Sequence, residues 1–295
     1  MVVQRVRYYI FLRDVFLLAL TTFGGPQAHL AHFQKVLVDK RKYLSEEDLL
    51  ELNSLCQILP GPASTQTLTA IGYKIGGPNL AYLTLLVWIL PAVILMTLAA
   101  IIMSNIQEKN WSLAFTRFIQ PMAVGFVSYG AYVISSKTIS TKTGVGLLLL
   151  AAIVSYFIQT PYIFPIIIIC SGLLTALKYK AQPKEEKTKI VIPWSNFILW
   201  AGVLIFAAVL GGLTKTWPQA LPIRLFENFY RNGSLIFGGG QVLTPLLYTE
   251  FVQYAPKQYL TSQEFLSGYA VAQSLPGPVF SFSSYIGALS MREYG

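Results

Sequence analysis

A Pro-Gly-Pro motif at residues 60–62 is the part of this chain best suited to bind a ligand. It is followed by the polar residues Ser64, Thr65 and Gln66. Each proline removes a backbone donor and pushes the preceding residue out of the helical region, so a continuous helix cannot run through the motif. A new helix that starts near Pro62 has unpaired N–H groups and a partial positive charge at its first turn. The motif therefore predicts an anion site to which the three polar side chains add donors.

The motif is one of three that occur twice, in the same order. The matching pairs are residues 23–26 (Phe-Gly-Gly-Pro) with 237–240 (Phe-Gly-Gly-Gly), 43–45 (Tyr-Leu-Ser) with 259–261 (Tyr-Leu-Thr), and 60–62 with 276–278 (both Pro-Gly-Pro). The first pair is 214 residues apart and the other two pairs are 216 residues apart. Three matches in one order indicate an internal duplication. The second Pro-Gly-Pro is followed by Val-Phe-Ser, so the two half-sites are not equivalent.

Each motif read alone fits a packing kink, because Gly and Pro are frequent in membrane helices. Duplication of the whole set favours a ligand or ion pathway, since paired broken segments mark the binding sites of transporters. The predicted substrate-binding residues are Gly24, Gly25, Pro26, Gln57, Pro60, Gly61, Pro62, Ser64, Thr65, Gln66, Gly238, Gly239, Gly240, Gln273, Pro276, Gly277, Pro278 and Ser281.

Other chemistry has little support in the sequence. His29 and His32 are three residues apart, but no third ligand accompanies them, so we expect a hydrogen-bonded role and no metal site. No phosphate-binding loop, no nucleophile–His–acid set and no dinucleotide motif is present, so we expect no cofactor and no enzyme. A membrane-embedded enzyme and an interaction scaffold stay as alternatives from other classes.

The elements that position these motifs are membrane helices. Of the 295 residues 54% are apolar and only 12% are charged, and the mean hydropathy is +0.54. Long uncharged stretches predict spans of about the length that a bilayer needs, and the longest of them, broken at residues 159–161, predicts two short helices. The predicted spans are residues 80–103, 118–136, 144–158, 162–177 and 194–214. The basic residues behind the net charge of +9 lie at the ends of these stretches, so we expect no nucleic-acid partner.

The sequence predicts an all-α, polytopic membrane protein built from two homologous repeats. We place the first repeat at residues 1–178, a charged cytoplasmic linker at 179–193 and an incomplete second repeat at 194–295. The span at 194–214 has no counterpart in the first repeat. If the first Pro-Gly-Pro segment crosses the bilayer, this extra crossing makes the two copies of the motif face opposite sides of the membrane, as in inverted repeats. If that segment instead re-enters on the same side, this argument from the parity of crossings fails. The crossing topology places the basic residues 35–42 outside, against the positive-inside rule. The short second repeat predicts a truncated chain or one that pairs with another copy.

The motifs in this order resemble the chromate ion transporter family. The resemblance rests on the run from residue 23 to His29, on residues 43–45, 59–65 and 72–73, and on their second-half counterparts up to residues 286–287. It implies a multi-pass protein of the bacterial inner membrane that exports chromate, and some members of the family are linked to the similar oxyanion sulfate. From the two broken segments we expect alternating access, in which they meet near the midplane and hold the oxyanion between their amide ends. Many members of this family carry a glutamate at the position of Gln66, so this chain departs from them there. Chromate and sulfate are both tetrahedral oxyanions, which agrees with helix N-termini and hydroxyls as binding groups.

Overall fold

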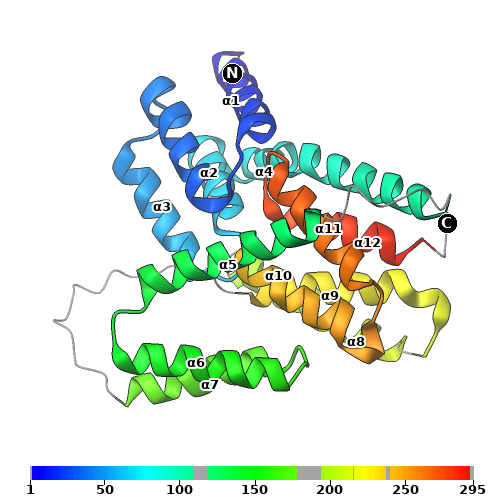
Figure 1. Cartoon of the computed structure of the whole chain (residues 1–295). Helices are drawn as coiled ribbons and strands as arrows, with labels where there is room; N and C mark the ends of the chain where they lie inside the picture. Colours follow the sequence, from blue (N-terminus) through cyan, green and yellow to red (C-terminus); the bar gives the residue numbers. More distant parts are fainter. Residues whose placement is uncertain (1, 109–117, 178–193, 215, 237–239, 293–295) are drawn as a thin grey trace. The chain divides into compact units, whose positions relative to one another are not determined.

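The computed structural model describes residues 2–108, 118–177, 194–214, 216–236 and 240–292. Every regular element in these ranges is a helix, which confirms the predicted all-α class (Figure 1). The elements are α1 (Val2–Thr21), α2 (Gly25–Phe33), η1 (Gln34–Lys40), α3 (Glu46–Ile58), α4 (Ala63–Glu108), α5 (Ile119–Thr138), α6 (Lys142–Phe157), α7 (Ile163–Ala176), α8 (Trp194–Leu213), η3 (Pro218–Ala220), α9 (Leu221–Leu235), α10 (Gly240–Tyr248), η4 (Thr249–Gln253), η5 (Ala255–Lys257), α11 (Ser262–Ser274), η6 (Val279–Ser281) and α12 (Phe282–Ser290).

Contacts divide the chain into two compact units. Unit 1 consists of Met1–Ala131, Asn232–Pro245 and Tyr259–Gly295, and unit 2 consists of Tyr132–Arg231 and Leu246–Gln258. Unit 1 therefore contains both Pro-Gly-Pro motifs. The predicted linker at residues 179–193 lies outside the described residues, and the division into repeats at that linker stays a prediction.

The first helix and the segment after it form a hairpin in unit 1. α1 ends at Thr21, and the chain turns through the glycines of the 23–26 motif into α2 and its π-helical continuation η1. The return path ends beside the middle of α1, where Arg41 pairs with Asp14 at 2.7 Å and Tyr43 donates a hydrogen bond of 2.8 Å to the same carboxylate. The crossing topology expected Arg41 beyond the far end of the first span. That expectation is wrong, because α2 and η1 lead the chain back along α1.

A second hairpin has the first Pro-Gly-Pro motif at its tip. A capping box between Ser45 and Asp48 starts α3, and the prolines end it. The chain returns through the first arm of α4 (residues 63–75), and an ion pair of 2.5 Å between Lys74 and Asp48 joins the two ends of the hairpin at its base. The 13 residues of α3 extend only about 20 Å, less than the hydrocarbon thickness of about 30 Å. This geometry matches the re-entrant alternative and removes the parity argument for inversion.

α4 is also broken, although it is continuous in hydrogen bonding. Gly76 and Gly77 have non-helical backbone angles, and the second arm of α4 (residues 78–108) begins there. The first arm packs back on the second, since Trp88 donates a 3.2 Å hydrogen bond to Thr65. The sequence analysis missed this break, which Gly-Gly-Pro at residues 76–78 encodes. The only described helix whose length and hydropathy suffice to cross a membrane is Ala63–Ile106, with a mean hydropathy of 2.8, and its second arm contains the predicted 80–103 span.

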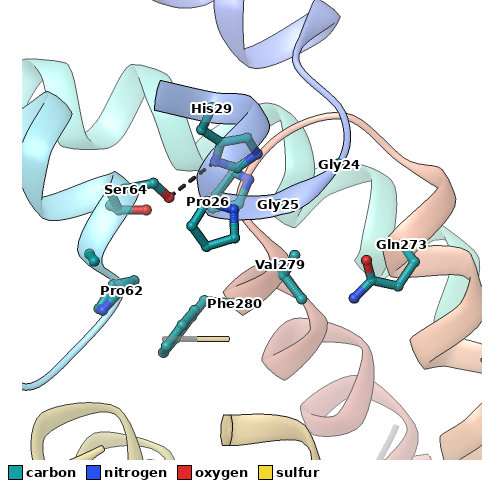
Figure 2. A pocket seen from close by; sticks show the side chains of 12 residues that line it. Gly24, Gly25, Pro26, His29, Pro62, Ser64, Gln273, Val279 and Phe280 are labelled. Carbon is teal, nitrogen blue, oxygen red and sulfur yellow. Dashed lines mark hydrogen bonds between the residues drawn. The ribbon is translucent and has the colours of Figure 1, made fainter. Parts of the chain in front are cut away.

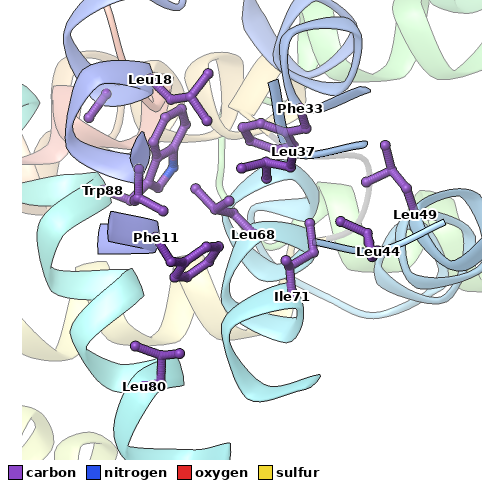
Figure 3. Close-up of a cluster of buried hydrophobic side chains, with 12 residues drawn as sticks. Phe11, Leu18, Phe33, Leu37, Leu44, Leu49, Leu68, Ile71, Leu80 and Trp88 are labelled. Atoms are coloured by element: carbon purple, nitrogen blue, oxygen red, sulfur yellow. The ribbon is translucent and has the colours of Figure 1, made fainter. Parts of the chain in front are cut away.

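The two hairpins share a hydrophobic core with the second arm of α4. Trp88 and Phe33 lie edge to face with ring centroids 5.6 Å apart at its centre. Figure 3 shows the cluster of buried side chains, which are Phe11, Val15, Leu18, Ala19, Phe33, Leu37, Leu44, Leu49, Leu68, Ile71, Leu80 and Trp88. This core fixes the position of both hairpin tips relative to Trp88.

The second half of the chain builds a similar hairpin. A capping box between Thr261 and Glu264 starts α11, which ends before the second Pro-Gly-Pro motif. The chain returns through η6 and α12, and Arg292 pairs with the carboxylate of Glu264 at the base. α12 packs along the second arm of α4, where Ser284 donates a hydrogen bond of 3.3 Å to the carbonyl oxygen of Val93.

The apolar helices of the remaining chain agree with the predicted spans. α5, α6, α7 and α8 match the other four predicted spans, and a turn at residues 158–162 separates α6 from α7 as expected. Among the described residues α6 buries no side chain, and apolar residues such as Ile153 and Ile169 are more than half exposed. Apolar surfaces of this kind suit contact with lipid.

Candidate oxyanion site

The tips of the hairpins in unit 1 surround a small pocket. It has a volume of about 40 Å³, which is room for a few water molecules or one small ion. Figure 2 shows its walls, which come from the start of α2, the start of α4, the end of α11 and the turn η6. The lining residues are Gly24, Gly25, Pro26, His29, Pro62, Ala63, Ser64, Thr65, Gln273, Pro278, Val279 and Phe280.

Two helix N-termini point their first turns toward this pocket. Gly24, the N-cap of α2, has a φ of 94°, and Pro26 occupies the first turn of that helix. α4 starts at Ala63, directly after Pro62, so both helices begin at a proline–glycine motif. The first amides of a helix have no partner within it and carry a partial positive charge. The two first turns therefore favour a negatively charged occupant.

Side chains in the first turns of these helices add hydrogen-bonding groups. The Oγ atom of Ser64 lies 3.0 Å from Nδ1 of His29, as the dashed line in Figure 2 marks. Both side chains are buried, and only 1% of His29 is exposed. Nε2 of His29 is buried and has no hydrogen-bond partner among the described residues. The ring lies edge to face with Trp88 at a centroid distance of 5.3 Å, which holds the imidazole in place.

The second Pro-Gly-Pro motif supplies a less polar wall. Val279 and Phe280 close the side of the pocket opposite Ser64 in Figure 2, and Phe280 occupies the position 216 residues after Ser64. Gln273 is the one polar side chain from this half among the lining residues, and its amide donates a 2.9 Å hydrogen bond to Tyr269. The sequence predicted this inequality of the two half-sites.

Backbone hydrogen bonds hold the tips of the hairpins against one another. The amide of Gly61 donates to the carbonyl oxygen of Ile236 at 2.7 Å, and the amide of Gly277 donates to that of Thr22 at 2.9 Å. Thr22 and Ile236 each directly precede a Phe-Gly-Gly motif. Each Pro-Gly-Pro glycine therefore bonds to a residue of the other half of the chain, directly before its Phe-Gly-Gly motif.

The predicted site residues fall into three groups. Those that line the pocket are Gly24, Gly25, Pro26, Pro62, Ser64, Thr65, Gln273 and Pro278. Those that are described but do not line it are Gln57, Pro60, Gly61, Gln66, Gly240, Pro276, Gly277 and Ser281. Gly238 and Gly239 lie outside the described residues. Gln66 instead donates a 2.7 Å hydrogen bond to the carbonyl oxygen of Pro60, which fastens the hairpin tip.

His29 is the main pocket residue that the sequence analysis did not select. It lies one turn into α2, which the 23–26 motif begins, so its spacing from Gly25 could have placed it at the site. His32 does not line the pocket. No group of three or more His, Cys, Asp or Glu residues suited to a metal ion occurs in the described part of the chain.

The charged cluster around Arg231 is separate from the pocket lining. Arg231 pairs with Glu227 at 2.7 Å and with Glu250 at 2.6 Å, and Lys257 also pairs with Glu250 at 2.6 Å. All four residues belong to unit 2. Two carboxylates thus balance the charge of Arg231.

Comparison with known proteins agrees with the architecture. The chain is 27% identical over 267 residues to a probable chromate transport protein of Synechococcus elongatus, covering 90% of this chain and 65% of the relative. It is 25% identical to an uncharacterized transporter of Methanocaldococcus jannaschii (92% and 66% covered) and 24% identical to a chromate transport protein of Cupriavidus metallidurans (90% and 64% covered).

The chain therefore spans just under two thirds of the length of these curated relatives. No solved structure was found to match it. The family description "Chromate transporter" matches residues 10–176 and 223–294, which is most of the chain. Since the match includes both Pro-Gly-Pro hairpins, the chain belongs to the chromate transporter family, whose members are integral membrane proteins.

Proposed function

We propose that the chain acts in a secondary transporter that carries a tetrahedral oxyanion, chromate in the first place, out of the cytoplasm across the inner membrane. This proposal rests on the pocket between the first turns of α2 and α4, which the side chains of Ser64, Thr65 and His29 line. None of the described lining residues is acidic. A site made of helix N-termini, hydroxyls and an imidazole suits an anion, and a tetrahedral oxyanion offers acceptors in several directions.

The two halves are proposed to be repeats with opposite orientation in the membrane. Their hairpins share several features at matching positions: a capping box before α3 and α11, a Pro-Gly-Pro tip, and an acid–base pair at the base. Each half also continues its glycine-started helix as a π-helix, η1 in the first and η4 in the second. The ion pairs at the base and the two π-helices support duplication in addition to the sequence motifs.

The second arm of α4 supports the inversion. Its start lies beside the hairpin that carries the first Pro-Gly-Pro motif, because a Cβ atom at Gly72 in the first arm would lie 3.2 Å from the carbonyl oxygen of Leu80. The tips lie beside its middle, at Trp88 and Ala92, and α12 continues along the part beyond Val93. The hairpin of α3 with the first arm of α4 and the hairpin of α11 with α12 therefore extend from opposite ends of the second arm, and their Pro-Gly-Pro tips lie beside its middle. Re-entrant hairpins of this kind from the two membrane faces would place the pocket near the midplane.

The re-entrant geometry also agrees with the charge rule. Arg41 pairs with Asp14 near the middle of α1, and Gly76, two residues after Lys74, lies beside Tyr8 in the N-terminal half of that helix. A cytoplasmic N-terminus then puts Arg41, its basic neighbours and Lys74 in the cytoplasm, as the positive-inside rule expects. Rocking of one hairpin pair against the other, across the Gly61 and Gly277 hydrogen bonds, would open the pocket to each side in turn.

The relatives named as chromate transport proteins favour chromate, and sulfate is the alternative substrate.

The test is uptake of chromate into everted membrane vesicles that contain the chain. The variant Ser64→Leu fills the pocket, and Ser54→Leu on the exposed face of α3 is the matched control. We expect Ser64→Leu to abolish uptake and Ser54→Leu to leave it unchanged. Full transport by Ser64→Leu would remove the site. Competing sulfate that blocks uptake more strongly than unlabelled chromate would make sulfate the substrate.

A further inference from the structure

The buried imidazole of His29 has one nitrogen engaged and one nitrogen without a partner. Nδ1 lies 3.0 Å from Oγ of Ser64, while Nε2 has no hydrogen-bond partner among the described residues. The side chain is 99% buried, with 1% of its surface exposed, and it lines the pocket. A buried polar atom without a partner is unfavourable unless a ligand or a water molecule satisfies it.

The partner of Nδ1 decides what Nε2 can do. A neutral imidazole has one N–H donor and one acceptor nitrogen. When the Ser64 hydroxyl donates to Nδ1, the proton of the ring is on Nε2, which becomes a donor. In the other tautomer Nε2 is an acceptor and faces a pocket whose helix N-termini present only donors. A bound oxyanion stabilises the first arrangement, because its oxygens accept hydrogen bonds.

We propose that His29 determines the specificity of the pocket by donating from Nε2 to an unprotonated oxygen of a tetrahedral dianion. This inference rests on the proposed function and deepens it, because it names the class of anion. Chromate and sulfate can present an oxygen without a proton on every side. Hydrogen phosphate carries an O–H group, which needs an acceptor. That group finds none at the Nε2 donor of His29, and the described lining residues include no carboxylate that would accept strongly. The pocket therefore selects sulfate-like dianions over hydrogen phosphate.

Three variants separate this role from a structural one. His29→Phe keeps an aromatic ring beside Trp88 but removes both nitrogens. His29→Gln keeps a side-chain amide that can donate or, after rotation, accept. His32→Phe is the matched control, since His32 lies one turn further along α2 and does not line the pocket. Size-exclusion profiles and thermal unfolding in detergent establish that each variant is folded.

The measurement is uptake of chromate into everted vesicles at pH 7.5, with sulfate or phosphate as competitors. In His29→Phe we expect the KM for chromate to rise about 10- to 100-fold, the effect of one hydrogen bond to a charged group. In His29→Gln we expect transport within a few-fold of wild type, with phosphate about 10-fold more effective as a competitor relative to sulfate. A residue with only a structural role would weaken all anions alike and leave the ratio of phosphate to sulfate unchanged.

The outcomes distinguish the two claims. An unchanged KM in folded His29→Phe, or an unchanged ratio of phosphate to sulfate in His29→Gln, overturns the role of His29 while the pocket stays the transport site. If wild type takes up no chromate and no sulfate while phosphate uptake is intact, the proposed substrate class itself is wrong. Purified wild type and variants are also titrated with chromate by isothermal calorimetry. That titration reads binding directly, and equal affinities of wild type and His29→Phe would overturn the inference even without transport.

Discussion

The amide of Gly277 donates a hydrogen bond of 2.9 Å to the carbonyl oxygen of Thr22, and the amide of Gly61 does the same to Ile236 at 2.7 Å. Each bond joins the Pro-Gly-Pro tip of one half to the residue that precedes the Phe-Gly-Gly motif of the other half. The exchange is reciprocal, so neither tip is built from one half alone. These two bonds hold the Pro-Gly-Pro tips in place directly beside Pro62 and Pro278, which line the pocket.

The first prediction concerns these two glycines. Gly61 has a φ of 118° and Gly277 a φ of 99°, and a Cβ atom at Gly277 would lie 2.9 Å from Cβ of Ala92. We expect Gly277→Ala to lower the free energy of unfolding by about 1–3 kcal/mol, because left-handed backbone is strained in alanine. SDS titration of purified protein measures the loss. Gly146→Ala in α6 is the control, since a Cβ atom there meets nothing within 4 Å. Equal stability of Gly277→Ala and wild type would contradict the tip geometry.

The second prediction concerns Asp14, which is buried beneath Arg41 and Tyr43. Its side chain is 4% exposed and accepts hydrogen bonds of 2.7 and 2.8 Å from those two residues. We expect Asp14→Ala to destabilise the first hairpin by about 3 kcal/mol, because it leaves a cation and a hydroxyl without their partner. Asp39→Ala on the exposed face of η1 should change stability by less than about 0.5 kcal/mol. The same SDS titration compares them, and similar losses for both variants would show that the cluster is not structural.

The third prediction is a pH dependence at the base of the second hairpin. Hydrogen bonds from Lys74 and then from Ser45 hold the pKa of Asp48 below its ordinary value. A carboxylate with a depressed pKa stabilises the fold above its unfolded-state pKa, and this stability is lost as the pH falls through the folded-state pKa. We therefore expect Lys74→Gln to have a lower Tm than wild type at pH 7 and the difference to shrink as the pH falls through the folded-state pKa of Asp48.

Unfolding midpoints between pH 7 and pH 3 in detergent test this dependence, with Lys35→Gln on η1 as the control. A difference between wild type and Lys74→Gln that stays constant at every pH would contradict the pairing of Lys74 with Asp48.

Much of the fold could be predicted from the sequence because its signals are local. Apolar stretches gave α5 to α8 within about two residues, and each Pro-Gly-Pro motif ended a helix where proline chemistry requires it. The first-turn residues Ser64 and Thr65 were expected at a ligand site and do line the pocket. These features depend on residues that are neighbours in sequence.

The features that the sequence did not reveal depend on contacts between distant residues. The return of η1 along α1 is fixed by Asp14 with Arg41, which are 27 positions apart. The burial of His29 depends on Trp88, and nothing near His29 in sequence indicates that ring. Gln66 was expected to bind the substrate, yet its amide reaches the carbonyl of Pro60, an acceptor that only the tip geometry creates. Residue types near a motif do not tell which side chains fasten it and which face the ligand.

The fourth prediction concerns the orientation of the two halves. Glu47 and Gln263 lie 216 residues apart, each exposed in the first turn of its hairpin helix. In a Cys56→Ser, Cys170→Ser background, a membrane-impermeant maleimide should label Glu47→Cys only from the cytoplasmic side. It should label Gln263→Cys only from the opposite side, because inverted hairpins have their bases on opposite faces. Labelling of both cysteines from one side would rule out the inversion.

The most direct test of the account is to locate chromate itself. Crystals of the protein soaked in chromate give an anomalous difference map from chromium. We expect one dominant peak in the pocket, within hydrogen-bond distance of Oγ of Ser64 and Nε2 of His29. A dominant peak elsewhere, or an empty pocket in a crystal that holds chromate at another site, would contradict the claim that the hairpin tips bind the oxyanion.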